Sequence, residues 1–218
     1  MADEDAAALD ALMESDRPSG TRDALLRFTA LVRQWSQKTD LVRVRTPDAL
    51  AELLFLDALQ LAAVVPEGAS VIDVGAGAGA PGLPLAVLRP DLRLVLLEPR
   101  RRRVMFMRLA AGSLQVSDRL EVREGRLDDP PSPETCGFDF AYSRATFAPP
   151  EWVRRGSALA REVGVLLARE EPPEPTSTLR LAQEHPYEVP SSGAPRRIVT
   201  FVTTEGGPDG PGLVGSAP

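Results

Sequence analysis

A glycine-rich segment between residues 71 and 82 constrains the fold of this chain more than any other feature of its sequence. It reads Val-Ile-Asp-Val-Gly-Ala-Gly-Ala-Gly-Ala-Pro-Gly, a short apolar run followed by alternating glycines. Glycine lets a backbone approach a ligand that a β-carbon would exclude. Because open α/β sheets bind ligands beyond the carboxyl ends of their strands, the segment predicts a buried strand, a ligand-binding loop and a following helix.

Apolar runs alternate with helical stretches along the rest of the chain. Alternation of this kind indicates a mostly parallel sheet with both faces covered. Beyond the strand at 70–74, we expect strands at 92–97, 120–122, 138–142, 163–168 and 198–202, helices at 84–88, 102–111 and 151–161, and loops at 172–175 and 191–195.

The N-terminal part of the chain has a different pattern. Leu25, Phe28, Val32 and Trp35 recur at three- and four-residue spacing, which indicates one face of a helix, and Pro47 suits the start of a second helix. The total of 218 residues favours a single domain. We therefore divide the chain into a partly disordered acidic segment (1–20), a helical extension (21–66), a ligand-binding domain (67–204) and a disordered tail (205–218).

The residues around the glycines indicate which ligand they hold. Gly77 to Gly82 fits the dinucleotide fingerprint, but Asp73 lies just before Gly75, where a carboxylate repels a pyrophosphate and attracts a cation. Asp-x-Gly-x-Gly-x-Gly is the usual first motif of S-adenosylmethionine-dependent methyltransferases, whose ligand carries a sulfonium and an ammonium. The sequence thus favours S-adenosylmethionine as the ligand. A nucleotide-dependent oxidoreductase is a distant alternative, and the structural alternative is that the glycines only form a tight turn between strand and helix.

Glu98 ends the next predicted strand. A carboxylate at that position can accept both hydroxyls of an adenosine ribose. Folds that bind NAD place an acid there too, so Glu98 indicates the ribose rather than one particular cofactor. The structural alternative is a favourable negative charge at the start of the following helix.

Further motifs resemble the bacterial RsmG (glucose-inhibited division protein B) family, whose members methylate N7 of a guanine in small-subunit ribosomal RNA. The resemblance covers about 60% of the chain by eye. It rests on residues 73–85 with Arg89-Pro-Asp91, Leu96-Leu-Glu98, Arg103-Val-x-Phe106-x-Arg108, Gly125-Arg-Leu-Asp128 and Phe138-Asp-x-x-x-Ser143-Arg-Ala145.

The resemblance implies a Rossmann-like class I methyltransferase fold, with a mostly parallel seven-stranded sheet behind an N-terminal helical extension, and S-adenosyl-L-methionine as cofactor. It adds cofactor contacts to those expected from Asp73, Gly77, Gly79 and Glu98, namely at Gly75, Ala80, Leu127, Asp128 and Arg144. Arg144 follows the fourth strand and is the candidate catalytic residue, in reach of cofactor or of an RNA phosphate. A structural salt bridge is the alternative for its side chain.

The chemistry of guanine N7 suits a chain with a single histidine, His185, and a single cysteine, Cys136. N7 presents a lone pair and has no proton to lose, so its methylation requires positioning but no general base. We expect no metal centre, and His185 is expected on the surface between elements. Phe147 and Trp152 are candidates to flank a flipped base.

The charge of the chain is unevenly distributed. The net charge of −6 argues against a protein that is basic all over, yet residues 89–126 hold ten arginines against five acidic residues. The densest cluster, Arg100 to Arg103, is suited to RNA phosphates, with a solvated helix start as the structural alternative. The expected partner is therefore 16S ribosomal RNA or the small ribosomal subunit.

The chain departs from the family pattern where polar residues are usual. This chain has Asp40-Leu-Val42 where the family usually has Asn-Leu-Thr, and Leu53 to Ala58 where the family usually has Arg-His-x-x-Asp-Ser. It has Arg169-Glu170 where Lys-Gly is usual. A methyltransferase of a small molecule or protein, and a cofactor-binding protein without catalysis, therefore stay open. The chain has neither a signal-peptide pattern nor an apolar stretch long enough for a bilayer, so we expect a cytoplasmic monomer with no membrane partner.

Overall fold

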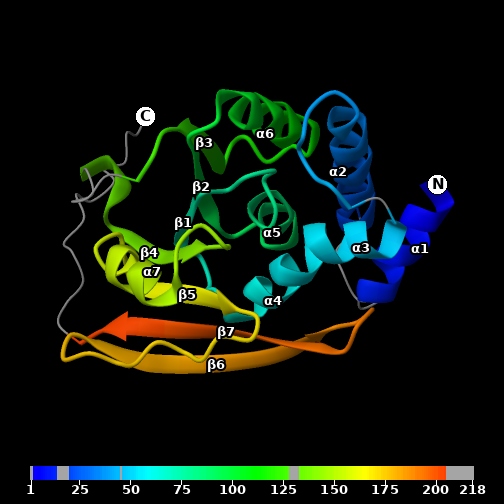
Figure 1. Ribbon diagram of the computed structural model, residues 1–218. Coiled ribbons are helices and arrows are strands. Elements are labelled where there is room, and N and C mark those ends of the chain that lie inside the picture. Colours follow the sequence, from blue (N-terminus) through cyan, green and yellow to red (C-terminus); the bar gives the residue numbers. More distant parts are fainter. Residues whose placement is uncertain (1, 14–19, 45, 128–132, 205–218) are drawn as a thin grey trace.

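The computed structural model describes residues 2–13, 20–44, 46–127 and 133–204, which include one seven-stranded sheet (Figure 1). The strands are β1 (Ser70–Val74), β2 (Arg93–Glu98), β3 (Leu120–Glu124), β4 (Phe138–Ser143), β5 (Ala160–Leu167), β6 (Leu179–Val189) and β7 (Ala194–Thr203). Their order across the sheet is β3-β2-β1-β4-β5-β7-β6. The first five run parallel and β7 is antiparallel to both neighbours, which confirms the predicted mostly parallel sheet.

Helices precede the sheet and connect its strands. They are α1 (Ala2–Leu12), α2 (Thr21–Ser36), α3 (Pro47–Ala51), the π-helical turn η1 (Glu52–Leu56), α4 (Asp57–Val64), α5 (Gly82–Leu88), α6 (Arg101–Ser113), the 3-10 turn η2 (Pro133–Thr135) and α7 (Pro149–Gly156). None of the helices in the described part of the chain has the length and apolar character needed to span a bilayer.

Alternate residues of each central strand pack into one of two cores, because successive side chains of a strand point to opposite faces of the sheet. On one face Val71 of β1 packs with apolar residues of the N-terminal helices, α5 and α6, among them Phe28 and Phe106. On the other face Ile72 packs with Trp152 of α7. The strands are buried on both sides and therefore read as nearly continuous apolar runs.

The N-terminal acidic segment contains a helix. Residues 2–12 form helix α1, which buries Leu9. Arg33 of α2 donates from Nε to the Asp5 carboxylate at 2.7 Å and so ties the two helices together. Residues 14–19 of this segment, and the predicted disordered tail at 205–218, lie outside the described residues.

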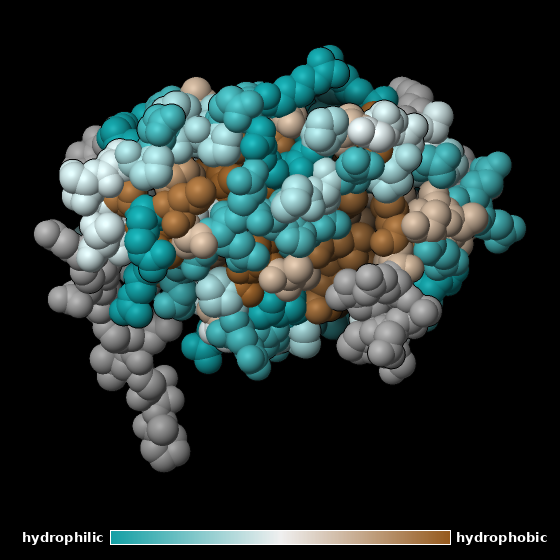
Figure 2. Space-filling view, turned by 90° about the horizontal axis from the view of Figure 1, so that it is seen from below, coloured by the Kyte–Doolittle hydropathy of each residue, from teal (hydrophilic) through white to brown (hydrophobic). Residues whose placement is uncertain are grey.

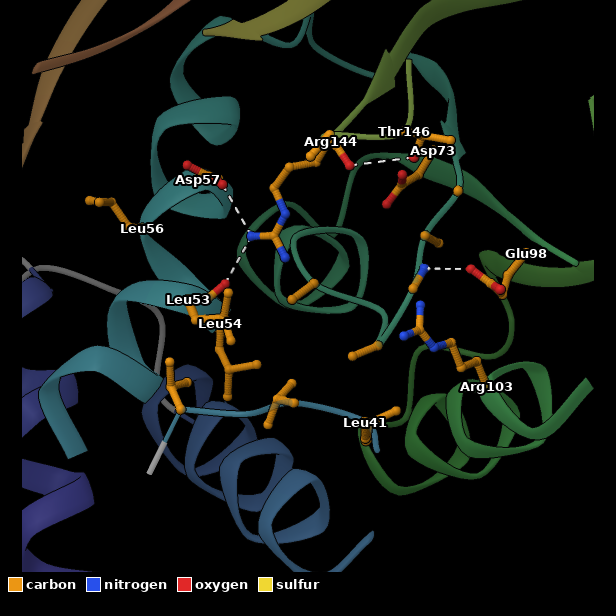
Figure 3. Close-up of a pocket in the computed structure, with 18 of the residues that line it drawn as sticks. Leu41, Leu53, Leu54, Leu56, Asp57, Asp73, Glu98, Arg103, Arg144 and Thr146 are labelled. Carbon is orange, nitrogen blue, oxygen red and sulfur yellow. Dashed lines mark hydrogen bonds and ion pairs between the residues drawn. The ribbon is translucent and has the colours of Figure 1, made fainter. Parts of the chain in front are cut away.

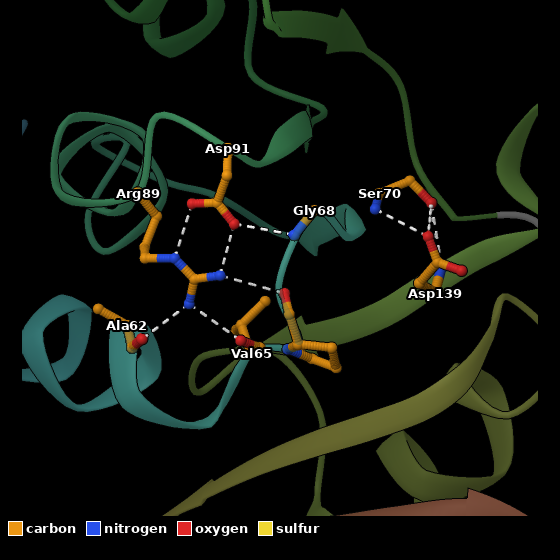
Figure 4. A network of polar contacts seen from close by, with 8 residues as sticks. Ala62, Val65, Gly68, Ser70, Arg89, Asp91 and Asp139 are labelled. Atoms are coloured by element: carbon orange, nitrogen blue, oxygen red, sulfur yellow. Dashed lines mark hydrogen bonds and ion pairs between the residues drawn. The ribbon is translucent and has the colours of Figure 1, made fainter.

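The Arg89-Pro-Asp91 motif has a structural role in the fold (Figure 4). Arg89 donates from Nη1 to the carbonyls of Ala62 and Val65, at 2.8 and 3.0 Å, and its guanidinium also pairs with Asp91. Asp91 in turn accepts the backbone N–H of Gly68 at 2.8 Å. The motif thus fixes the connection between α4 and β1 to the end of α5, away from the glycine loop.

Two elements near the C-terminus differ from the sequence-based prediction. Helix α7 ends at Gly156, and strand β5 begins at Ala160 where we expected helix to continue. Strand β6 was not predicted, because its sequence is mostly polar and contains Pro186. It forms an edge of the sheet, where a proline removes no hydrogen bond that the sheet needs. Figure 2 shows the molecule from this side, where hydrophilic side chains predominate and hydrophobic ones show in separate patches.

Candidate active site

A cavity of about 870 Å³ lies beyond the carboxyl ends of β1, β2 and β4, where the glycine motif predicted a ligand (Figure 3). We call its two walls the glycine side and the helix side. The glycine side consists of Asp73, Gly75, Ala76, Gly77, Ala78, Ala80, Glu98, Pro99, Arg100, Arg103 and Arg126. The helix side consists of Leu41, Val42, Val44, Ala49, Glu52, Leu53, Leu54, Leu56, Asp57, Val189 and Arg196, and residues 144–146 lie between the two.

Gly75 turns the chain out of β1 at the base of the cavity. Its φ of +80° lies in the left-handed region, and its N–H donates to the carbonyl of Leu97 at 2.8 Å. A β-carbon here would lie 2.2 Å from Oγ1 of Thr146, which lines the cavity. Only glycine therefore fits. Thr146 was missed in the sequence, where nothing connects it to residue 75.

Glu98 is buried at the end of β2, and its carboxylate organises the loop opposite. Oε2 accepts the N–H of Gly77 and Oε1 accepts the N–H of Arg100, both at 2.9 Å. The second contact places a negative charge at the start of α6, next to its cluster of arginines, as the structural alternative supposed. Each oxygen keeps a further lone pair, so the carboxylate can also accept a hydroxyl of a ligand.

Asp73 is a buried carboxyl group in the wall of the cavity. Burial raises the pKa of Asp73 to about 7, against the opposing effects of the Tyr142 hydroxyl and of Arg144. That hydroxyl donates to Oδ2 of Asp73 at 3.0 Å. A buried carboxylate without a cationic partner is unfavourable, so this group favours a ligand that brings positive charge. Tyr142 was not identified from the sequence.

Arg144 follows β4 and reaches across the cavity to the helix side (Figure 3). Its Nη1 donates to the Leu53 carbonyl at 2.9 Å and to Oδ2 of Asp57 at 3.1 Å. Arg144 thus forms the salt bridge of the structural alternative and also lines the cavity, and its catalytic role stays a prediction. Leu53 belongs to the π-helical turn η1, a local irregularity that is frequent at functional sites. The next residue, Ala145, has a φ of 56°, unusual for a side chain that is not glycine.

The other predicted cofactor residues divide into three groups. Gly77 and Ala80 line the cavity. Gly79 does not line it, and a β-carbon there would meet Leu83 at 2.5 Å, so this glycine lets helix α5 pack. Leu127 is half-buried against the core beneath α7 and is not part of the lining, while Asp128 lies outside the described residues.

Only some of the predicted RNA-binding arginines line the cavity. Of the cluster at 100–103, Arg100 and Arg103 line the glycine side, whereas Arg101 and Arg102 are not part of the lining. Arg126 joins them on the same side, and Arg196, from β7, lies on the helix side. No pattern in the sequence singles out Arg196.

Two expectations about ring side chains are wrong. Phe147 and Trp152, proposed to flank a base, stack on each other with ring centroids 5.8 Å apart, and the Trp152 indole is buried and donates to the Gly164 carbonyl. Neither lines the main cavity. His185, expected between elements, lies within β6 and is hydrogen-bonded to the Gln60 side chain at 2.9 Å.

The sheet order and the glycine-lined cavity beyond its strands are those of the class I methyltransferase fold, whose members use S-adenosylmethionine. A solved structure, "Structure of the Mitomycin 7-O-methyltransferase MmcR", has the same fold with a TM-score of 0.54 at 18% identity, covering 92% of this chain and 67% of that one. At such low identity the likeness concerns the fold alone.

The sequence comparisons give the family. A profile of the GidB family, rRNA small subunit methyltransferase G, matches residues 21–184. The protein of that name from Frankia casuarinae is 38% identical over 188 residues, which are 81% of this chain and 70% of the relative. Its namesake from Desulfotalea psychrophila is 42% identical over 120 residues, which are 55% of this chain and 54% of the relative. The chain belongs to this family, and the predicted resemblance, fold class and cofactor are confirmed.

Proposed function

We propose that this chain transfers a methyl group from S-adenosylmethionine to N7 of a guanine in 16S ribosomal RNA, free or in the small subunit. Membership of the rRNA small subunit methyltransferase G family supports both the reaction and the acceptor. The observation that carries the proposal is a single cavity with two chemically different walls. Its volume of about 870 Å³ is near the upper end of the roughly 300–1,000 Å³ typical of ligand sites, enough for a cofactor and part of a second molecule.

The glycine side fits the cofactor. Asp73 offers a buried carboxylate to its cationic methionine end, and Glu98 offers oxygen acceptors to its ribose hydroxyls. S-adenosylmethionine, when bound, supplies a methyl group on a positively charged sulfur. To the same role we assign Gly75, Gly77 and Ala80 through their backbone, Gly79 through the shape of the loop, and Leu127 and Asp128 at the adenine.

The helix side fits a flat acceptor that needs no deprotonation. Aliphatic side chains from Leu41 to Leu56 form most of this wall. Its two carboxylates are engaged, Glu52 by Ser191 and Asp57 by Arg144, and the described lining holds no histidine, cysteine or lysine. Guanine N7 already presents a lone pair, so methyl transfer needs the two partners held in line and in contact.

Arg144 is the residue we assign to contact with the acceptor. A guanidinium has five N–H donors, and both hydrogen bonds to the helix side use Nη1. Nη2 and Nε therefore remain for a base oxygen or an RNA phosphate in the cavity. Around the entrance, Arg100, Arg103, Arg126 and Arg196 supply positive charge for the RNA backbone.

The acceptor is tested in a strain from which the gene has been deleted. Small-subunit RNA from that strain should lack an N7-methylguanine that the parent strain contains, and a plasmid with the wild-type gene should restore it. Plasmids that carry Asp73→Ala or Arg144→Ala serve as matched controls and should fail to restore it. An unchanged modification in the deletion strain rejects the ribosomal acceptor, and a methyl group lost instead from a protein or a small molecule supports one of the alternative substrates.

A further inference from the structure

Strand β6 and the turn after it contact the helical segment formed by η1 and α4 through three pairs of residues. Ser191 donates from its backbone N–H and its Oγ to Glu52, both at 2.7 Å. The Tyr187 hydroxyl donates to Oδ1 of Asp57 at 2.9 Å, and His185 is hydrogen-bonded to Gln60. All three partners from this strand and turn follow residue 184, where the match to the family profile ends.

The Tyr187 contact differs from the other two because it continues into the cavity. Asp57 uses one carboxylate oxygen for Tyr187 and the other for Nη1 of Arg144 at 3.1 Å. The Arg144 and Asp57 side chains are 26% and 14% exposed, so water competes little for either of them. The three residues lie on three separate elements, β6, α4 and the loop after β4, and their hydrogen bonds connect these elements at the cavity.

The contacts of Asp57 determine where the Arg144 guanidinium can lie. A carboxylate that accepts two hydrogen bonds from different directions is fixed in rotation, and a guanidinium bonded to it inherits that orientation. If the tyrosine hydroxyl is removed, Asp57 can turn, and Arg144 keeps the Leu53 carbonyl as its one remaining fixed partner. The surrounding packing does not change, because a phenylalanine ring occupies the same space.

We propose that Tyr187 is a positioning residue for methyl transfer, which acts through Asp57 to hold Arg144 at the helix side of the cavity. This inference rests on the proposed function in one respect, the use of Arg144 in catalysis. The C-terminal hairpin, formed by β6 and β7, then contributes to catalysis and not only to stability. Tyr187 itself is not part of the lining of this cavity.

The first test compares Tyr187→Phe with Ser191→Ala. Each variant removes one hydroxyl that donates to a carboxylate of the same helical segment, but only the first carboxylate is bonded to Arg144. We expect Tyr187→Phe to lower kcat for RNA methylation about fivefold to tenfold. This is less than the roughly tenfold to hundredfold of a hydrogen bond to a charged group, because Arg144 keeps its contact with the Leu53 carbonyl. The Kd for S-adenosylmethionine and the Tm should stay near wild type, and Ser191→Ala should keep the wild-type kcat.

A double-mutant cycle asks whether Tyr187 acts through Arg144. In an Arg144→Ala background, Tyr187→Phe should cause no further loss of kcat, because the group that it positions is gone. An equal loss in both backgrounds overturns the proposal, and so does a wild-type kcat for Tyr187→Phe alone.

A second measurement does not depend on activity. ¹⁵N relaxation of arginine Nε groups, with Arg144 assigned from an Arg144→Lys variant, should show a rigid Arg144 in the wild type and in Ser191→Ala. In Tyr187→Phe the order parameter of this group should fall. If wild-type protein transfers no methyl group to RNA while Arg144 is still loosened by Tyr187→Phe, the proposed function fails and the positioning stands. An Arg144 of unchanged order in Tyr187→Phe overturns the positioning itself.

Discussion

The two walls of the cavity are built in different ways. On the glycine side, the loop at residues 75–80 forms one continuous part of the wall, next to the ends of the adjacent strands β1 and β2 and three arginines. On the helix side, side chains from the segment after α2, from the π-helical turn and from the C-terminal hairpin meet in space. The first wall is therefore recognisable in the sequence as a motif, and the second is not.

This difference also separates what the chain shares with its family from what it has changed. The glycine side keeps the family pattern, whereas the helix side carries Leu53 and Leu54 where an arginine and a histidine are usual. Asp57 is retained within that altered stretch, and it is the residue that binds Arg144.

The largest effect is expected from a β-carbon at the base of the glycine side. Gly75→Ala places a carbon 2.2 Å from Oγ1 of Thr146, so the loop must move, and we expect cofactor affinity to fall by more than roughly a hundredfold in calorimetric titration. Gly68→Ala is the matched control, because its φ of +68° gives similar strain but no atom lies within 4 Å. It should cost about 1 kcal/mol of stability and leave affinity unchanged. Wild-type affinity in Gly75→Ala would show that the cofactor binds elsewhere.

A smaller effect is expected from the charge of Asp73. Because burial raises the pKa of Asp73 to about 7, the carboxyl group is largely protonated below that pH and attracts a cation only above it. The affinity for S-adenosylmethionine should therefore rise with pH and level off above pH 7. Of the charged groups around it, Arg144 favours the ionised form and Glu98 opposes it.

Asp73→Asn removes this titration while it keeps the shape of the side chain. At pH 8 we expect roughly tenfold to hundredfold weaker binding, the range for a hydrogen bond to a charged group, and a flatter pH profile. Calorimetry from pH 6 to pH 8.5 on both proteins separates this contribution from titration of the cofactor itself, which is common to the two. Parallel profiles for the two proteins would contradict the assignment of Asp73.

The smallest effect is expected on RNA binding, from the arginines that line the cavity. It distinguishes Arg100 and Arg103 from the other two members of the same cluster. Arg100→Gln with Arg103→Gln should weaken RNA binding and reduce the slope of log affinity against log salt by about 1.4, or 0.7 for each phosphate contact with single-stranded RNA. Arg101→Gln with Arg102→Gln changes the net charge equally at positions that do not line the cavity. It should leave the slope near wild type. Equal slopes for the two double variants would mean that only the overall charge matters.

The sequence was sufficient for the fold where local patterns determine it. The buried strands β1, β2 and β4 and the turn at Gly75 were predicted because apolar runs and glycines specify them directly. Strand β6 was missed because its polar, exposed pattern is dictated by its place at the edge of the sheet. The contacts of Arg144 with Asp57, and of Asp57 with Tyr187, could not be predicted either, since 87 and 130 residues separate the partners and the folded sheet brings them together.

Methyl transfer with purified components tests the central claim most directly. Small ribosomal subunits from the deletion strain are incubated with the protein and S-adenosylmethionine labelled in its methyl group, and the modified nucleotide is then mapped. We expect label to enter a single guanine of 16S ribosomal RNA at N7 with wild-type protein, and Gly75→Ala to transfer none. Label in protein or small molecules but not in the RNA, or no transfer by the wild type, would contradict it.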